Sequence, residues 1–371
     1  MEQTIFAEKI FTGQMVLDNH LVICDKGRIA SIQPATANGS GLKVKFLSAG
    51  LFDTHINGGD QYYLTKTPSA ACVEDIAVSC RTLGTAYTLP TVITSPLENI
   101  LNAVEAVKNY MEKTPYGGVM GMHLEGPFLN PLKRGAHLAE YIQRPSDSAL
   151  QEIIKYGKGT IKLMTIAPEV FTEKQIVMLL ESGITISAGH SNATYDEAQS
   201  VFKKGVHLVT HLYNAMSGFG HRTPGLTGAA LDNDDVYTPI ILDGFHCNYG
   251  AARIAYKIKK EKLFLVSDAL FTGDKIRHFQ WGNYDAWLKD GRYSNSEGNL
   301  SGAAICLGDA VRNAVNEVGI SLQEAIEMAT VRPAIALGLE KQIGSLKTGF
   351  PSVFTSFDES LRKFTEIRIN Q

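Results

Sequence analysis

The sequence predicts an α/β protein whose centre is a closed barrel of eight parallel strands, with a small β-domain built from both ends of the chain. Between Gly50 and Asp268, apolar runs alternate with helical segments and give eight β-then-α units. A doubly wound open sheet rarely needs so many units, whereas a closed barrel requires them. The pattern at both ends of the chain predicts short strands with tight turns instead. The predicted fold is therefore a TIM-like (β/α)8 barrel with a flanking β-domain.

The two ends of the chain supply the flanking domain. Residues 5–45 consist of short apolar runs separated by turns such as Asp25-Lys26-Gly27. The same style returns at Ser352-Val353-Phe354 and again at residues 364–369. We therefore expect one β-domain from residues 1–48 plus 345–371, and a catalytic barrel from residues 49–344.

The eight candidate strands of the barrel mostly end at a polar residue. Their ends fall near His55, Thr94, Glu125, Ala167, His190, His211, His246 and Asp268. Several helix starts are marked by capping boxes, in which a hydroxyl residue precedes Glu or Gln by three positions. These boxes are Ser148…Gln151, Thr172…Gln175, Thr194…Glu197 and Ser321…Glu324. Residues 279–299, with the turn Asp290-Gly291, predict a hairpin excursion near the site.

Composition and charge exclude several classes of partner. The chain has 35 Lys and Arg against 38 Asp and Glu, a net charge of −3, and no long basic run, so nucleic acid and membranes are not expected partners. Its start lacks the pattern of a signal peptide, and no window approaches a membrane span, which places the protein in the cytoplasm. Five scattered cysteines favour reduced thiols, and Cys247 is expected to be a small buried residue.

Three residues at candidate strand ends predict a metal site. Glu125 follows the apolar run Gly118–Met122 and precedes Gly126-Pro127, so a carboxylate sits where a buried strand meets a loop. An ionised Glu cannot be buried there without a partner, and a cation is one remedy. His190 and His211 occupy equivalent positions. One oxygen and two nitrogen ligands suit Zn²⁺ or a similar divalent metal such as Fe²⁺ and leave a position open for water.

Asp268 ends the eighth candidate strand and can accept a proton from the attacking water and pass it to a leaving amine; its alternative role is to cap a turn. His55 and Asn57 end the first strand, where either could reach a second metal or form only a hydrogen bond.

Three further residues are candidates for contacts with the substrate. His246 could contact substrate or be structural. His137 could polarise a carbonyl. Arg222, in a Gly- and Pro-rich loop, suits a phosphate or is a solvated surface residue.

One competing motif is Gly189-His190-Ser191-Asn192-Ala193, which approximates the G-x-S-x-G elbow of serine hydrolases. Its last position is Ala rather than Gly. The downstream acid and base, Asp243 and His246, are only three residues apart. The elbow is therefore a weak interpretation.

Taken together, the motifs resemble the N-acetylglucosamine-6-phosphate deacetylases of the amidohydrolase superfamily. The segments that carry the resemblance run in order along the barrel: Asp53–Gly59, His123–Phe128, Arg134–His137, Ala167–Glu169, Gly189–Ala193, Thr210–Met216, Arg222–Gly225, Asp243–His246 and Ser267–Ala269. The pair His-Leu-Glu-Gly-Pro-Phe and Thr-His-Leu-Tyr-Asn-Ala-Met is specific. The resemblance implies a small β-sandwich beside the barrel and a homodimer.

The resemblance also implies a reaction and its residues. The reaction is hydrolysis of N-acetyl-D-glucosamine 6-phosphate to D-glucosamine 6-phosphate and acetate, in amino-sugar metabolism. The metal is held by Glu125, His190 and His211; Asp268 exchanges the proton, and His137 and the metal stabilise the oxyanion. Substrate contacts fall on Ala136, His137, Asn214, Ala215, Arg222, Asp243, His246, Leu300, Ser301 and Gly302.

Two departures from the family pattern leave questions open. The sequence His55-x-Asn57 is a hybrid of the H-x-H of two-metal members and the Q-x-N of single-metal members, so metal number is undecided. Phe350-Pro351-Ser352 replaces an acidic turn after the barrel. Alternative functions are a related hydrolase acting on N-acetylgalactosamine 6-phosphate or a cyclic amide, and a catalytically silent barrel used for binding.

Overall fold

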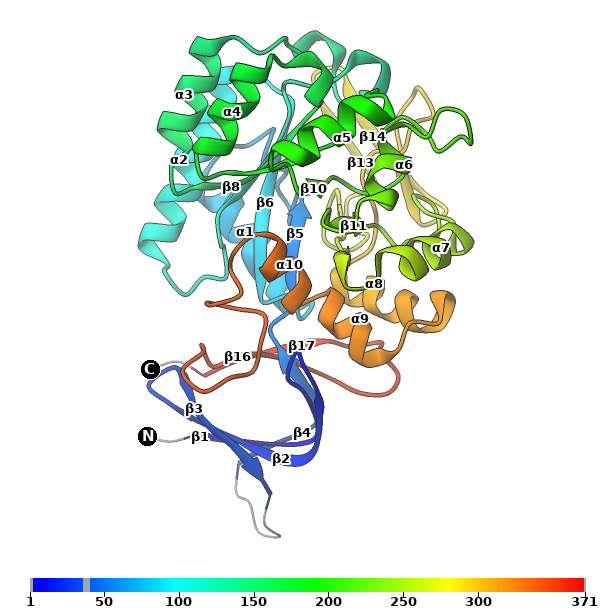
Figure 1. Cartoon of the computed structure of the whole chain (residues 1–371). Coiled ribbons are helices and arrows are strands. Elements are labelled where there is room, and N and C mark those ends of the chain that lie inside the picture. The colour runs from blue at the N-terminus through cyan, green and yellow to red at the C-terminus, as the bar shows by residue number, and fades with distance from the viewer. Residues whose placement is uncertain (1–2, 36–40, 370–371) are drawn as a thin grey trace.

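The computed structural model describes residues 3–35 and 41–369. It contains the eight-stranded parallel barrel that the sequence predicts (Figure 1). The barrel strands are β5 (Phe52–Ile56), β6 (Tyr87–Ile93), β7 (Met122–Glu125), β8 (Ile161–Ile166), β9 (Thr185–Ala188), β10 (Leu208–Val209), β11 (Thr238–Ile240) and β12 (Leu263–Leu265). Strands β5 to β10 form one sheet and β11 to β12 a second. Parallel bridges Leu208–Tyr237 and Ile56–Ala269 join the two sheets and close the barrel.

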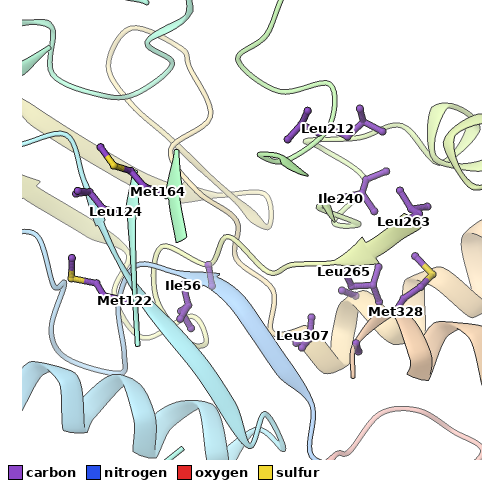
Figure 2. Packing of buried hydrophobic residues seen from close by; sticks show 14 of the residues in the cluster. Ile56, Met122, Leu124, Met164, Leu212, Ile240, Leu263, Leu265, Leu307 and Met328 are labelled. Carbon is purple, nitrogen blue, oxygen red and sulfur yellow. The ribbon is translucent and has the colours of Figure 1, made fainter. Parts of the chain in front are cut away.

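Helices cover the outside of the barrel because each carries an apolar face toward the strands. They are α1 (Ala70–Thr82), α2 (Leu97–Lys113), α3 (Asp147–Gly157), α4 (Glu173–Glu181), α5 (Tyr195–Lys204), α6 (Gly225–Asp232), α7 (Tyr249–Lys259), α8 (Leu307–Asn313), α9 (Leu322–Met328) and α10 (Val331–Ala336). Short 3-10 turns span Pro131–Lys133, Ala139–Tyr141, Pro168–Val170 and Lys260–Lys262, and a π-helical turn, Ala314–Val318, continues α8. Figure 2 shows side chains of strands and helices meeting in one apolar cluster, among them Ile56, Leu265, Leu307 and Met328.

Both ends of the chain share one six-stranded sheet below the barrel, where both termini lie (Figure 1). Its strands, in spatial order, are β17 (Thr365–Arg368), β16 (Val353–Phe357), β4 (Leu42–Ala49), β1 (Gln3–Phe11), β2 (Val16–Asp25) and β3 (Arg28–Pro34). Strands β4 and β16 pair antiparallel and so link the two ends of the chain. Because β5 follows β4 after two residues, the sheet lies at the amino ends of the barrel strands. The exact domain boundaries stay a prediction.

The excursion after the eighth strand is a three-stranded antiparallel sheet of β13 (His278–Trp281), β14 (Tyr284–Lys289) and β15 (Arg292–Ser294). The predicted hairpin is confirmed, with one additional strand. Its turn falls at Asp290 and Gly291, both with positive φ (52° and 79°), as a two-residue type I′ hairpin requires. Residues 298–302, which follow β15, line a cavity that also contains Glu125, His190 and His211.

The seventh strand of the barrel, β11, is shorter than the sequence predicts. It was expected to end near His246 but ends at Ile240. The reason is the carboxylate of Asp243, whose Oδ1 accepts hydrogen bonds from the backbone N–H groups of Phe245 (2.9 Å) and His246 (2.7 Å). This side-chain turn offers the backbone an alternative to the strand ladder.

The capping boxes at Thr172 and Thr194 are confirmed, and Ser321 caps α9 through the backbone N–H of Glu324. The predicted box at Ser148 is wrong. Ser146 is the N-cap of α3, with extended backbone, and its hydroxyl accepts from the N–H of Ala149. An N-cap needs a non-helical backbone, and Ser148 already lies within the first turn.

This correction gives a test with a matched control on the same helix. Ser146→Ala is expected to lower the free energy of unfolding by about 1 kcal/mol, because the N–H of Ala149 loses its acceptor. Ser148→Ala is expected to change it by less than about 0.5 kcal/mol. Urea unfolding followed by circular dichroism measures both. A larger loss for Ser148→Ala than for Ser146→Ala would contradict the assignment of the cap.

Candidate active site

The residues predicted to bind the metal and to take part in the reaction lie together at the carboxyl ends of the barrel strands. Glu125 is the last residue of β7, His55 lies in β5, and His190 and His211 each lie two residues beyond a strand. His190, His211 and Asp268 all have positive φ (47°, 32° and 47°). Residues other than glycine rarely adopt this conformation, and such strain concentrates at functional sites. The backbone is therefore in an unusual conformation at three of the predicted site residues.

Three ligand atoms form a tight triangle. Oε1 of Glu125 lies 3.2 Å from Nε2 of His190 and 3.2 Å from Nε2 of His211, and the two Nε2 atoms are 3.2 Å apart. A tetrahedral ion with bonds of about 2.0 Å places its ligand atoms about 3.3 Å apart. The spacing of Glu125, His190 and His211 thus matches the geometry that such an ion needs.

The hydrogen bond of the His190 ring supports the same interpretation. Nδ1 of His190 donates a hydrogen bond to the backbone carbonyl of Lys133 at 2.9 Å. In the neutral ring, Nε2 then carries a lone pair, which faces the lone pairs of Glu125. A cation between these groups removes the conflict. The carbonyl of Lys133 also fixes the ring orientation, as the outer partner of a metal-binding histidine usually does.

The second oxygen of Glu125 faces two further histidines. Oε2 lies 3.4 Å from Nε2 of His55 and 3.4 Å from Nε2 of His137. Ligand atoms of Glu125, His137 and His190 also fall within 4.8 Å of one another, so this trio is a looser alternative for holding a metal. The 3.2 Å triangle fits the bond lengths better. Glu125 therefore lies between four imidazole rings in the buried centre of the site.

Asp268 lies beside the same cluster. Its Oδ1 is 3.1 Å from Nε2 of His55 and accepts a hydrogen bond from Nδ2 of Asn57 at 3.0 Å. The side chain is 13% exposed, so it reaches the cavity while its neighbours are buried. His55 and Asn57 thus contact the carboxylate of Asp268, and His55 also approaches Glu125.

Charge and burial oppose each other at this cluster. Burial raises the pKa of Glu125, but the surrounding rings of His55, His137 and His190 outweigh it and hold that pKa well below its usual value. Burial lowers the pKa of His55, but the carboxylates of Asp268 and Glu125 raise it to about 9. Burial and the neighbouring His55 lower the pKa of His123, which stays a neutral ring bonded to Thr165. Glu125 is accordingly ionised, and positive charge beside it stabilises the buried carboxylate.

The cluster opens into a cavity of about 360 Å³. Eight of the ten predicted substrate-contact residues line it: Ala136, His137, Asn214, Ala215, His246, Leu300, Ser301 and Gly302. Asp243 lies behind His246, whose Nδ1 is 2.6 Å from its Oδ2. Arg222 is not brought into this cavity and lines a separate hollow with Lys133.

The sequence interpretation missed several lining residues, including Tyr63, Ile93 and Tyr284. It also missed Thr94, whose Oγ1 lies 2.8 Å from Nδ1 of His137. Thr94 follows strand β6 directly, so its place at a strand end was the one available signal. The aromatic residues carried none, because an apolar residue in an apolar run does not reveal which face it occupies.

The structure also tests the expectations for Ser191 and for the cysteines. Ser191 donates its hydroxyl to Glu169 at 2.7 Å, which commits it to a carboxylate rather than to a histidine base. All five cysteines are free, and burial raises the pKa of the Cys247 thiol to about 12, as befits a packing residue.

Across residues 3–35 and 41–369, no helix is long and apolar enough to cross a membrane.

A closed (β/α)8 barrel with a carboxylate and histidines at the carboxyl ends of its strands defines the class of barrel hydrolases that work with a divalent metal. Residues 46–368 match the amidohydrolase family. The chain belongs to this family, and the resemblance seen in the motifs is confirmed.

Within this family, the chain is similar to several named sugar-phosphate deacetylases. The N-acetylglucosamine-6-phosphate deacetylase of Haemophilus influenzae is 36% identical over 349 residues, which cover 92% of this chain and 91% of the relative. The N-acetylgalactosamine-6-phosphate deacetylase of Escherichia coli O157:H7 is 28% identical over 365 residues, 97% and 96% of the two chains. The crystal structure of N-acetylglucosamine-6-phosphate deacetylase from Pasteurella multocida has a TM-score of 0.93 at 34% identity and covers 98% of this chain and 97% of its own.

Proposed function

We propose that this chain hydrolyses N-acetyl-D-glucosamine 6-phosphate to D-glucosamine 6-phosphate and acetate, as a step of amino-sugar catabolism or recycling. The observation that carries the proposal is the 3.2 Å triangle of Glu125, His190 and His211 beside Asp268 in one cavity. Relatives of the same name, which match nearly the whole chain, support the substrate.

Glu125, His190 and His211 are the residues proposed to hold the metal. A divalent ion bound there would polarise the acetyl carbonyl and make water acidic enough to attack at neutral pH. One carboxylate and two imidazoles favour Zn²⁺, with Fe²⁺ as the alternative. His55 and Asn57 are proposed as a second position, where an imidazole and an amide oxygen would join the free side of Glu125.

Asp268 is proposed to move the proton. Its Oδ1 accepts a hydrogen bond from Asn57 and lies near His55, so Oδ2 is the oxygen proposed to exchange the proton. A carboxylate held in this way takes the proton of the attacking water and returns it to the nitrogen of the breaking amide bond. Without that second transfer, the amine would have to leave as an unstable anion.

His137 is proposed to stabilise charge on the acetyl oxygen. Its Nδ1 is hydrogen-bonded to Thr94, which orients the ring so that Nε2 faces Glu125 and the cavity. A proton on Nε2 can then be donated to a carbonyl oxygen as it becomes negative. Thr94 acts through His137 and is a positioning residue.

The remaining lining is proposed to hold the sugar phosphate. The cavity lining includes Ala136, Asn214, Ala215 and His246. It also includes Leu300, Ser301 and Gly302, which come from the segment after the three-stranded sheet. Asp243 orients His246 through the 2.6 Å contact with Nδ1. Tyr63 and Tyr284 add aromatic surface for the sugar ring.

The test of the substrate is a comparison of kcat/KM for N-acetylglucosamine 6-phosphate and N-acetylgalactosamine 6-phosphate, measured as acetate release by the metal-loaded protein. We expect the gluco epimer to be hydrolysed faster. Faster hydrolysis of the galacto epimer would transfer the proposal to the function of the E. coli relative. Turnover of a cyclic amide with no release from either sugar would contradict it.

Arg222 is proposed to attract the phosphate. It lines a hollow of about 470 Å³ together with Asn192 and Lys133. Lys133 accepts a hydrogen bond from His190, so the hollow is close to the proposed metal ligands. Arg222→Ala is expected to raise KM for the phosphorylated sugar about tenfold and to leave KM for unphosphorylated N-acetylglucosamine unchanged. Steady-state kinetics with both substrates measure the difference. Equal changes for both sugars would remove the phosphate role.

We further propose that the protein is a cytoplasmic homodimer. A surface hollow of about 430 Å³ is lined by Phe219 (67% exposed), Ile254 (56%) and Ile258 (44%), which suits burial against a second copy. The five free thiols fit a reducing compartment. Sedimentation velocity is expected to give a dimer; Ile254→Asp is expected to give a monomer, and an unchanged dimer would exclude this face.

A further inference from the structure

A second cavity lies at the other end of the barrel from the active site. Its volume is about 530 Å³, and its walls come from the β2–β3 turn, from residues at the ends of α1 and α2, and from β16 and β17. Arg368, in its wall, donates a hydrogen bond to the carbonyl of Ala86, the residue directly before β6. The cavity therefore lies where the terminal sheet meets the amino ends of the barrel strands.

The walls of this cavity are strongly basic. Among the residues that the structure describes, no Asp or Glu lines it, and five cations do: Lys26, Arg28, Arg81, Lys113 and Arg368. Arg368 is neutralised by Glu366. For the other four, no ion pair is formed within residues 3–35 and 41–369. The chain as a whole carries a net charge of −3, so this concentration of positive charge is local.

Helix ends explain only part of this charge. Arg81 and Lys113 lie in the last turns of α1 and α2, where a cation offsets roughly half an elementary charge of the helix dipole. Lys26 and Arg28 come from a β-turn at no helix end. Arg28 is held in place by donating to the carbonyl of Gly349 at 2.7 Å, which is a neutral partner. The excess of cations is therefore free to bind an anion.

The rim of the cavity is apolar and partly aromatic. Tyr116 is 68% exposed, and Pro115 and Pro351 lie in the same lining. Flat apolar surface next to clustered cations suits a ligand that has a ring at one end and phosphates at the other. The volume is within the range of about 300–1,000 Å³ that small-molecule sites occupy.

We propose that this cavity binds a phosphorylated small molecule of the nucleoside diphosphate class, with the phosphates on Lys26, Arg28, Arg81 and Lys113 and the ring against Tyr116. Such a ligand contacts the barrel and the terminal sheet at once. It occupies a site separate from the catalytic cavity, so the proposal does not depend on the proposed substrate.

Isothermal titration calorimetry of the metal-loaded protein with ADP tests the proposal. Its metal content is measured before and after, because diphosphates chelate metal ions. We expect one ADP site, and Arg81→Gln/Lys113→Gln is expected to raise its Kd at least about tenfold. The control pair Lys108→Gln/Lys203→Gln removes the same charge from exposed positions outside the cavity and is expected to bind ADP normally. No binding of ADP, or equal binding by both double variants, would overturn the proposal.

Two further measurements separate the parts of the ligand. Pyrophosphate is expected to bind more weakly than ADP and to lose affinity in Arg81→Gln/Lys113→Gln. Tyr116→Ala is expected to weaken ADP binding and to leave pyrophosphate binding unchanged; no change for either would contradict the ring position. Arg81→Gln/Lys113→Gln is expected to keep its rate of acetate release, which shows that the variant is folded and that the lost site is not the catalytic one.

Discussion

Glu125→Gln is expected to remove bound metal and deacetylase activity together, with a fall in kcat/KM of at least about a thousandfold. Oε1 of Glu125 forms two sides of the 3.2 Å triangle with His190 and His211. Glutamine keeps the size of the side chain but replaces the charge that four surrounding imidazole rings stabilise. Losing a charged ligand of a three-residue set costs most of the affinity for the ion, and without the ion neither water nor carbonyl is activated.

The measurement combines metal content by mass spectrometry with acetate release on the same preparation. Glu98→Gln, an exposed charge removal on α2, is the control and is expected to behave as the unsubstituted protein. Circular dichroism checks that Glu125→Gln is folded. Full metal occupancy in folded Glu125→Gln would contradict the assignment of Glu125 as a ligand and would favour a site without it.

Asp268→Asn is expected to keep the metal and to lower kcat by about two to four orders of magnitude. The amide is the same size and still offers an oxygen to Asn57, so the site keeps its shape. It cannot accept a proton from water at neutral pH. KM is expected to change little, because the loss falls on the transition state rather than on binding.

The two variants separate two roles that a shared loss of activity would hide. Metal analysis of Asp268→Asn is expected to match the unsubstituted protein, whereas that of Glu125→Gln is not. Near-normal turnover by Asp268→Asn would reject the proposed proton transfer. Loss of metal from it would instead place Asp268 among the ligands, next to His55 and the proposed second position.

The sequence could predict the barrel and the gathering of the site because both follow from one regularity. Parallel strands of a barrel bring their carboxyl ends to one face, so polar residues that follow apolar runs meet there even when they are far apart in the chain. Glu125 and His211 are 86 positions apart and 3.2 Å apart in space for this reason. No local pattern was needed beyond the end of each strand.

The sequence could not predict features that depend on loop paths. Arg222 has the chemistry of a phosphate ligand, but the loop that carries it leaves the side chain in a neighbouring hollow. The contact of Thr94 with His137 joins two loops whose relative position no spacing rule describes. Ser146 and Ser148 are equivalent in residue type, and only the backbone conformation decides which one caps α3.

The basic cavity escaped the sequence for a related reason. Its cations come from segments separated by most of the chain, from Lys26 to Arg368, and none forms a basic run. A charge cluster of this kind exists only after the terminal sheet has met the barrel.

The central claim is metal-dependent deacetylation, and its most direct test is acetate release from N-acetylglucosamine 6-phosphate by one preparation in three states: as purified, after chelation and dialysis, and after addition of Zn²⁺ or Fe²⁺. We predict release as purified, loss of release after chelation, and recovery with metal. Release that persists in protein shown to be free of metal, or no release in any of the three states, would contradict the account.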